Sequence, residues 1–124
     1  MDFVDANVII KAFTDNAEKE KCRDILQEGF VTTTVCLLEA FHGIAVIKRN
    51  NLYAAYCIKS LYKSNGTIVP VDKNILFEAF RRLEKSSLSI FDLVSYSTAV
   101  LWNCNSIVSY DKDFDGGDIK RTEP

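Results

Sequence analysis

Four isolated acidic residues are the best candidates in this sequence for chemical activity. Glu39 is the only Asp, Glu, Lys or Arg between positions 28 and 48, and Asp92 is the only one between positions 85 and 111. Asp5 stands alone between positions 2 and 11, and Asp111 opens an acidic turn. A carboxylate in an apolar stretch must be paired, metal-bound or protonated, because burying it uncompensated is too costly. No lysine or arginine lies one helical turn from Glu39 or Asp92.

Four such carboxylates, brought together by the fold, would favour a divalent cation. Two carboxylates about 5 Å apart repel by roughly 3 kcal/mol at an effective dielectric constant near 20, and several such pairs would strain a marginally stable domain. A cation removes this repulsion, and an all-oxygen ligand set selects Mg²⁺ or Mn²⁺ rather than Zn²⁺. Such ions lower the pKa of a bound water and neutralise charge on the attacking and leaving oxygens, which suits phosphodiester hydrolysis.

Each acid also has a purely structural interpretation. Asp5 could cap a helix, and Asp92 could favour a helix N-terminus. Glu39 could lie on the solvated stripe of its helix, and Asp111 could be one turn residue among several. Both interpretations stay open for each residue alone, but the four structural ones are much less convincing together.

The elements that must position these acids alternate along the chain. Four β-prone runs are separated by stretches of helical character: Phe3–Val4, Phe30–Thr32, Thr67–Val71 and Ser106–Ser109. We expect helices over Ala17–Glu28, Val35–Lys48, Asn51–Tyr62, Lys73–Lys85 and Ser89–Asn103. Their N-caps would be Thr33 or Thr34, Asn50 or Asn51, Asp72, and Ser87 or Ser89. This alternation predicts an α/β fold with a mainly parallel sheet.

Parallel sheets place ligand sites beyond the carboxyl ends of their strands. Asp5 and Asp111 each fall just after a predicted strand, so their side chains should enter such a crevice.

The bulk composition is that of an ordinary globular protein. The chain has 124 residues, a net charge of −2 and no polybasic run, and metal ions could bridge such an acidic surface to a polyanion. The four cysteines show no Cys-x-x-Cys pair and the chain has one histidine, so free thiols are expected rather than a zinc site. No secretory signal or membrane span is visible, which predicts a soluble, cytoplasmic protein.

Four segments, in order and spread over nearly the whole chain, resemble the motifs of the PIN domain and, within it, of VapC-like toxins of type II toxin–antitoxin pairs. No single motif is specific, whereas their order, spacing and start near position 5 make the combination strong. The segments are Phe3–Ile9, an apolar run with Asp-Ala-Asn; Glu39–Gly43, a glutamate with a glycine four residues on; Phe91–Leu93, leading into an apolar helix; and Ile107–Phe114, with Ser109 where the family usually has threonine.

The resemblance implies one PIN-like nuclease domain over residues 1–124, folded as a three-layer α/β/α sandwich around a mainly parallel sheet. It implies a Mg²⁺- or Mn²⁺-dependent endoribonuclease acting on single-stranded RNA, with a homodimeric state and a cognate antitoxin as further expectations. Asp5, Glu39, Asp92 and Asp111 would be catalytic and hold the metal, with Asp113 as a further ligand, while Asn7 and Ser109 would orient ligands or water.

Other assignments rest on less. Lys11, Lys48, Arg49 and Lys112 are candidates for contacts to RNA phosphates, although most surface lysines are only solvated. A haloacid-dehalogenase-type phosphatase would need a second aspartate at position 7, where this chain has Asn7. The alternatives that stay open are an RNA-processing PIN nuclease without an antitoxin and a catalytically inactive PIN-like binding or scaffold module.

Overall fold

The central layer of the protein is a five-stranded sheet in which every neighbouring pair of strands is parallel. The computed structural model describes residues 1–124. The strand order is β3-β2-β1-β4-β5. The strands are β1 (Phe3–Val4), β2 (Phe30–Thr33), β3 (Gly66–Val69), β4 (Ser106–Val108) and β5 (Lys120–Thr122).

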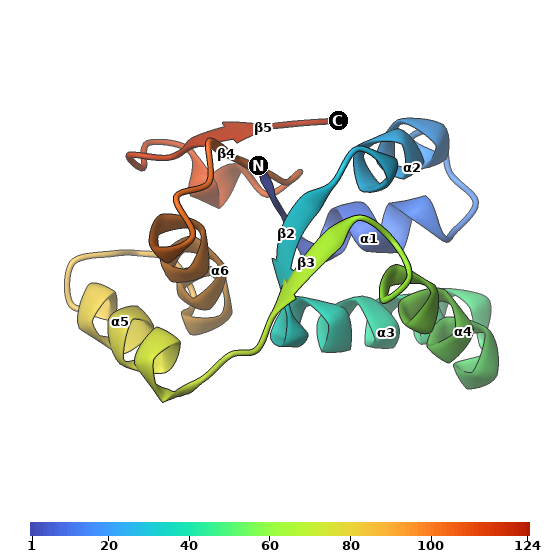
Figure 1. Ribbon diagram of the computed structural model, residues 1–124, viewed down its shortest axis with the longest axis horizontal. Helices are drawn as coiled ribbons and strands as arrows, with labels where there is room; N and C mark the ends of the chain where they lie inside the picture. The colour runs from blue at the N-terminus through green and yellow to red at the C-terminus, as the bar shows by residue number, and fades with distance from the viewer.

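Six α-helices form the two outer layers. They are α1 (Ala6–Ala12), α2 (Lys19–Gln27), α3 (Thr34–Lys48), α4 (Asn51–Leu61), α5 (Lys73–Leu83) and α6 (Ile90–Leu101), and a short 3₁₀ helix, η1, spans Lys112–Phe114. Figure 1 shows α1–α4 on one side of the strands and α5 and α6 on the other. The predicted three-layer α/β/α fold with a parallel sheet is therefore confirmed. No helix is both long and apolar enough to cross a membrane.

The predicted N-caps fix where four helices begin. The side chains of Thr33, Asn50, Asp72 and Ser89 accept hydrogen bonds from backbone N–H groups in the first turns of α3, α4, α5 and α6, respectively. Each bond satisfies a donor that the helix itself leaves free. The cap at Thr33 matters for function, because α3 starts directly after β2 and carries Glu39 in its second turn.

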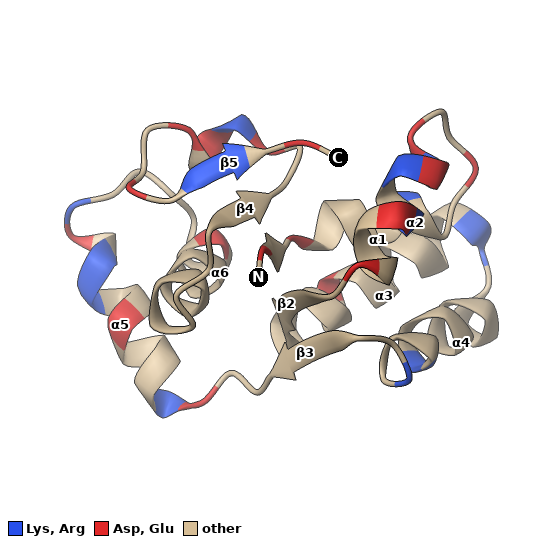
Figure 2. Cartoon of the chain, turned by 45° about the horizontal axis from the view of Figure 1, so that its top comes forward, with Lys and Arg blue, Asp and Glu red and all other residues tan.

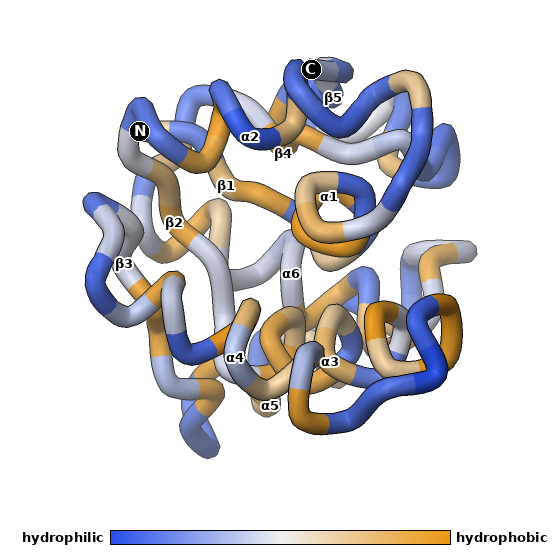
Figure 3. Tube along the Cα trace, turned by 90° about the vertical axis from the view of Figure 1, so that its right-hand side faces the viewer, coloured by the Kyte–Doolittle hydropathy of each residue, from blue (hydrophilic) through white to orange (hydrophobic).

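The core lies around the central strands. Phe3, Phe30 and Ile107 are fully buried, as are most apolar side chains of β1, β2 and β4. Figure 3 shows this pattern as hydrophobic colour along β1 and β2, with the hydrophilic end of the chain at the edge near β5. Because β1 and β4 are buried, they fix the backbone just beyond their carboxyl ends. Asp5 follows β1 there, and Asp111 lies three residues after β4.

Three features differ from the sequence prediction. Strand β5 was not predicted, and α1 was raised only as a helix that Asp5 could cap. Helix α3, in an apolar segment of the sequence, is not largely buried. Leu38 is 70% exposed and Glu39 is exposed as well. The hydrophobic side chains of α3 lie on all of its faces, so its sequence period does not reveal which face packs inward.

Gly66 in β3 lies directly against the ring of Phe30 in β2. A Cβ atom at position 66 would overlap three ring carbons of Phe30, a side chain with no solvent exposure. Because a buried ring cannot swing away, a glycine is required at this position of the sheet.

Gly66→Ala should therefore lower the free energy of unfolding by about 1–3 kcal/mol, through overpacking against Phe30. Chemical denaturation of the wild type, both single variants and the double variant with Phe30→Leu measures the effect. The smaller leucine should relieve the overlap, so the two substitutions should cost less together than the sum of their separate costs. Strictly additive costs would show that the contact does not constrain position 66.

Candidate metal and active site

The candidate site lies where the two central strands of the sheet end. Asp5 directly follows β1, and Ser109 directly follows β4, which pairs with β1 in parallel. The chain leaves β1 toward β2 on one side, while β4 lies on the other, so the order of the strands switches here. Such a switch point opens a crevice at the carboxyl ends of the strands.

Asp5 is a buried carboxylate held by hydrogen bonds. It is 8% exposed, and it caps α1 by accepting from the backbone N–H of Ala6 at 2.8 Å. The Ser109 hydroxyl donates to its other oxygen at 2.7 Å. The structural interpretation as a helix cap is thus correct, and it leaves the negative charge of Asp5 without a cationic partner.

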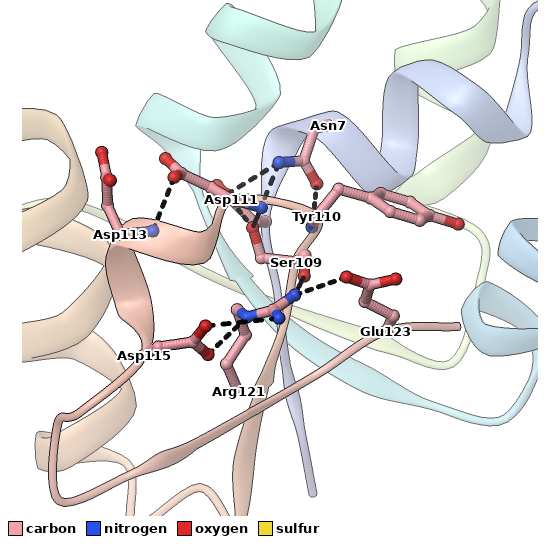
Figure 4. Close-up of polar contacts among 9 residues, drawn as sticks. Asn7, Ser109, Tyr110, Asp111, Asp113, Asp115, Arg121 and Glu123 are labelled. Carbon is pink, nitrogen blue, oxygen red and sulfur yellow. Dashed lines mark hydrogen bonds and ion pairs between the residues drawn. The ribbon is translucent and has the colours of Figure 1, made fainter.

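Asn7 and Ser109 connect Asp5 to the loop that carries Asp111, as Figure 4 shows for the residues on the loop. The Asn7 amide donates to Ser109 Oγ at 3.1 Å, and its oxygen accepts from the backbone N–H of Tyr110 at 3.3 Å. The Asp111 backbone N–H donates to Ser109 Oγ at 3.0 Å. The two residues predicted to orient ligands therefore fix the spacing between two of the candidate acids.

Three acids lie close enough to share one cation. Asp92 in the first turn of α6, Asp111 and Asp113 each offer a carboxylate oxygen, and these oxygens lie within 4.8 Å of one another. Asp111 caps η1 by accepting from the backbone N–H of Asp113 at 2.9 Å, a contact seen in Figure 4. Asp113, named from sequence only as a further ligand, belongs to this closest group.

Glu39 approaches the group from α3. The residue as a whole is exposed. Partial burial of its carboxyl, and then the charges of Asp5 and Asp92, raise its pKa above the ordinary value. In Figure 2, acidic segments at the β1–α1 junction, in α3 and at α6 surround the middle of the molecule, while the basic segments lie mostly toward the periphery. All five predicted acids thus meet around one site.

Burial and mutual repulsion raise the pKa of three of the acids, Asp5, Glu39 and Asp92. Burial, and then the charges of Asp111 and Asp5, raise the pKa of Asp92 to about 6. Burial also raises the pKa of Asp5, against the opposing effect of its hydrogen bonds from Ser109 and Ala6. None of the acids forms an ion pair with a lysine or arginine.

The donor set fits a hard divalent cation. Carboxylate oxygens dominate the site, the serine and asparagine beside them offer further oxygens, and the exposed His42 makes no part of the closest group. Such a set suits Mg²⁺ or Mn²⁺, which would also neutralise the repulsion. All four cysteines are free and buried.

The four basic residues considered from sequence lie in different settings. Lys11 stands over the Tyr110 ring at 5.0 Å and shares a surface hollow with Asn7, so it borders the site. Lys112 is exposed between two of the acids. Lys48 pairs with Asp15 at 3.4 Å. Arg49 is exposed and ends α3 in the left-handed backbone conformation.

Residues that the sequence analysis missed support the site from behind. Cys36 lies one helical turn before Glu39, with its sulfur 4.0 Å from Asp5 and 3.4 Å from the Ser95 hydroxyl. Burial and the charge of Asp5 raise the pKa of the Cys36 thiol to about 11, so it stays protonated and can donate. The spacing of Cys36 and Ser95, three residues from Glu39 and Asp92, was the available signal.

Arg121 in β5 was also missed. Figure 4 shows its guanidinium between Asp115 and Glu123, with ion-pair distances of 2.7 Å to each. It also donates to the Ser109 carbonyl at 3.0 Å. This one side chain therefore fastens β5 and the 111–115 loop to the end of β4.

Asp92→Asn should stabilise the metal-free protein at neutral pH. Because the pKa of Asp92 in the fold is about 6 against an ordinary 3.8, folding disfavours its ionised form, and stability falls as the pH rises from about 4 to about 6. After allowance for solvent screening of this half-buried group, the variant should gain about 1 kcal/mol, or roughly 3–5 °C in Tm, at pH 7.5. Circular dichroism melts in EDTA measure this gain, which should shrink at pH 4.5. A variant that melts below the wild type at pH 7.5 would refute the repulsion argument.

The sequence and fold of the chain were compared with those of known proteins. No curated protein sequence is significantly similar to the chain. Its fold is similar to the crystal structure of VapC20 from Mycobacterium tuberculosis, described as a sarcin–ricin loop cleaving toxin, with a TM-score of 0.85, 14% identity and full coverage of both chains. It is also similar to a toxin–antitoxin complex from Klebsiella pneumoniae, with a TM-score of 0.76, 16% identity and coverage of 98% of this chain and 97% of that one. The family model described as PIN domain matches residues 3–119, and the chain therefore belongs to the PIN domain family.

Proposed function

We propose that the chain is a Mg²⁺- or Mn²⁺-dependent endoribonuclease that cleaves single-stranded regions of RNA, and that it is the toxin of a type II toxin–antitoxin pair. The observation that carries this proposal is the group of acids at the switch point of the sheet, which no lysine or arginine neutralises. Asp5, Glu39, Asp92 and Asp111 are the proposed catalytic residues, and Asp113 is the proposed additional ligand.

The side chains of the site have separable proposed roles. Divalent ions, when bound, supply the positive charge that activates water for attack on phosphorus and stabilises the leaving oxygen. Asp92, Asp111 and Asp113 would hold such an ion, and Asp5 and Glu39 would add negative charge around it. Asn7 and Ser109 would keep Asp5 and the Asp111 loop in register.

Binding of RNA would need positive charge beside the acids. We expect Lys11, which lies over the Tyr110 ring, and the exposed Lys112 to contact phosphates that flank the reacting one. Bound metal would add to this attraction, so a chain with a net charge of −2 can still bind a polyanion.

Two observations support assignment as a toxin with protein partners. The similar structures include a toxin described as cleaving the sarcin–ricin loop and a toxin–antitoxin complex. The surface also leaves large apolar side chains uncovered, as expected where a second copy or an antitoxin binds. They include Leu38, Leu52, Tyr56 and Tyr62 on α3 and α4 or just after them, and Phe77, Phe80 and Phe91 on α5 and α6.

Purified protein should cleave structured RNAs with exposed loops in the presence of Mn²⁺, and EDTA should stop the reaction. Asp92→Asn should lower the cleavage rate by roughly a hundred-fold or more, since it removes a proposed metal ligand. Asp24→Asn, an exposed acid on α2 that forms no ion pair, is the matched control and should leave the rate unchanged. Gel mapping of the RNA ends gives the readout, and full activity of Asp92→Asn would refute the assignment.

Mn²⁺ should also stabilise the fold. At 100 times its dissociation constant, a bound ion adds about 2.7 kcal/mol, or roughly 8–12 °C in Tm for a chain of this size. The shift should disappear in Asp92→Asn and persist in Asp24→Asn. Differential scanning fluorimetry measures it, and an unchanged Tm in the wild type would favour the catalytically inactive scaffold.

A small reading frame that overlaps or adjoins this gene would separate a toxin from an RNA-processing enzyme. Co-expression of its product should relieve growth inhibition by this chain and form a complex with it. A chain that cleaves RNA but neither inhibits growth nor has such a neighbour would instead be an RNA-processing nuclease.

A further inference from the structure

A second hollow, of about 510 Å³, adjoins the acidic site. It lies between the C-terminal end of α5, the loop that follows it and the loop after η1, and Asp113 is one of its lining residues. The acidic group and this hollow therefore share one residue, Asp113, and lie next to each other. Its volume falls in the range of roughly 300–1,000 Å³ that is usual for small-ligand sites.

Arg82 is the unusual residue of this hollow. Its Nε atom is buried and has no hydrogen-bond partner, one of only two such buried side-chain atoms in the protein. Its guanidinium forms no ion pair, and instead lies 5.4 Å from the centre of the Tyr96 ring. No hydrogen bond or ion pair within the chain uses the Arg82 guanidinium, so this group is available to a ligand that enters the hollow.

Tyr96 is itself fixed. It is 8% exposed, and its hydroxyl oxygen accepts from the backbone N–H of Asp118 at 2.9 Å. Gly117 permits this close approach, because a Cβ there would lie 2.9 Å from the Tyr96 ring. The loop after η1 therefore positions Tyr96, and Tyr96 supports Arg82 in a set orientation. A guanidinium oriented in this way can form a fork of hydrogen bonds to an oxyanion at low entropic cost.

The other charges of the hollow are largely occupied. Arg81 is paired with Glu78 at 2.6 Å, and Asp115 is paired with Arg121. Bound metal would neutralise Asp113. Arg82 and Lys85 are then opposed only by Glu84, so the hollow attracts an anion.

We propose that this hollow is a subsite for a nucleotide that flanks the cleaved bond, and that Arg82 binds the phosphate of that nucleotide. The inference rests on the proposed ribonuclease function and adds a substrate contact to it. A nucleotide suits the hollow because the partly exposed Leu88 provides apolar surface beside the arginine, above the buried Leu93 and Phe114. An acidic peptide could also pair with Arg82, but the neighbouring acidic group at Asp113 gives no reason for a peptide to bind there.

The test compares two basic residues of one helix, α5. Arg82→Gln should raise KM for a short single-stranded RNA by roughly ten- to hundred-fold, the loss expected for one charge-assisted hydrogen-bonded contact, with kcat changed less than about three-fold. Lys73→Gln removes an exposed charge at the other end of α5, outside the hollow, and should change KM less than about two-fold. Steady-state cleavage in Mn²⁺ gives both constants.

Binding of a fluorescein-labelled RNA to the same variants, in an Asp92→Asn background at several salt concentrations, gives a second readout. Arg82→Gln should reduce the slope of log affinity against log salt by about 0.7, the value for one phosphate contact on a single strand. Arg82→Lys keeps the charge and should preserve the slope while binding more weakly than the parent. If Arg82→Gln proves unstable, Arg82→Lys still tests whether the charge at this position binds RNA.

The outcomes separate this inference from the proposed function. Cleavage by the wild type with equal KM values for Arg82→Gln and Lys73→Gln would overturn the subsite alone. Loss of binding to an antitoxin segment, with RNA affinity unchanged, would also overturn it and assign Arg82 to the partner protein. A wild type that neither binds nor cleaves RNA would overturn both proposals together.

Discussion

Repulsion among carboxylates that no basic side chain neutralises is the constraint on which the rest of this structure depends. Asp92, Asp111 and Asp113 approach within 4.8 Å, and Asp5 adds its charge from a buried position. These carboxylates would move apart if the backbone and side chains that position them were flexible. The supports are stiff: Ser109 and Asn7 fix Asp5, and Arg121 fastens the loop after β4. The fold thus maintains a concentration of negative charge that a bound cation, or protonation of an acid such as Asp92, can relieve.

Helix α6 joins this site to the neighbouring hollow. Asp92 in its first turn faces the acids, and Tyr96, four residues later, supports Arg82. The loop after η1 does the same from the other side, since Asp113 belongs to both regions and Gly117 packs on Tyr96. One helix and one loop therefore align a site for a cation with a site for an anion, the arrangement that a phosphodiester chain needs.

Much of the fold could be predicted from sequence because its signals are local. Thr33 and Asp72 cap helices through hydrogen bonds to residues two or three positions away, and the apolar runs of β2 and β4 are self-evident strands. Strand β5 escaped prediction because Lys120–Thr122 is short and polar, and it is held by Arg121 through contacts distant in sequence. The sequence left open whether Glu39 is exposed, since an apolar helix does not reveal which of its faces packs inward.

The candidate site divides along the same line. The acids could be identified because each is an isolated charge in an apolar stretch, where burial is costly. Arg82 is surrounded by other charged residues in the sequence, so nothing there indicates that its Nε is buried.

The most direct measurement is a crystal structure of Mn²⁺-soaked protein with anomalous diffraction from the metal. A peak about 2.2 Å from carboxylate oxygens of Asp92 and Asp111 is the predicted result. An ordered, empty acidic group at saturating Mn²⁺, or an ion bound elsewhere, would contradict it.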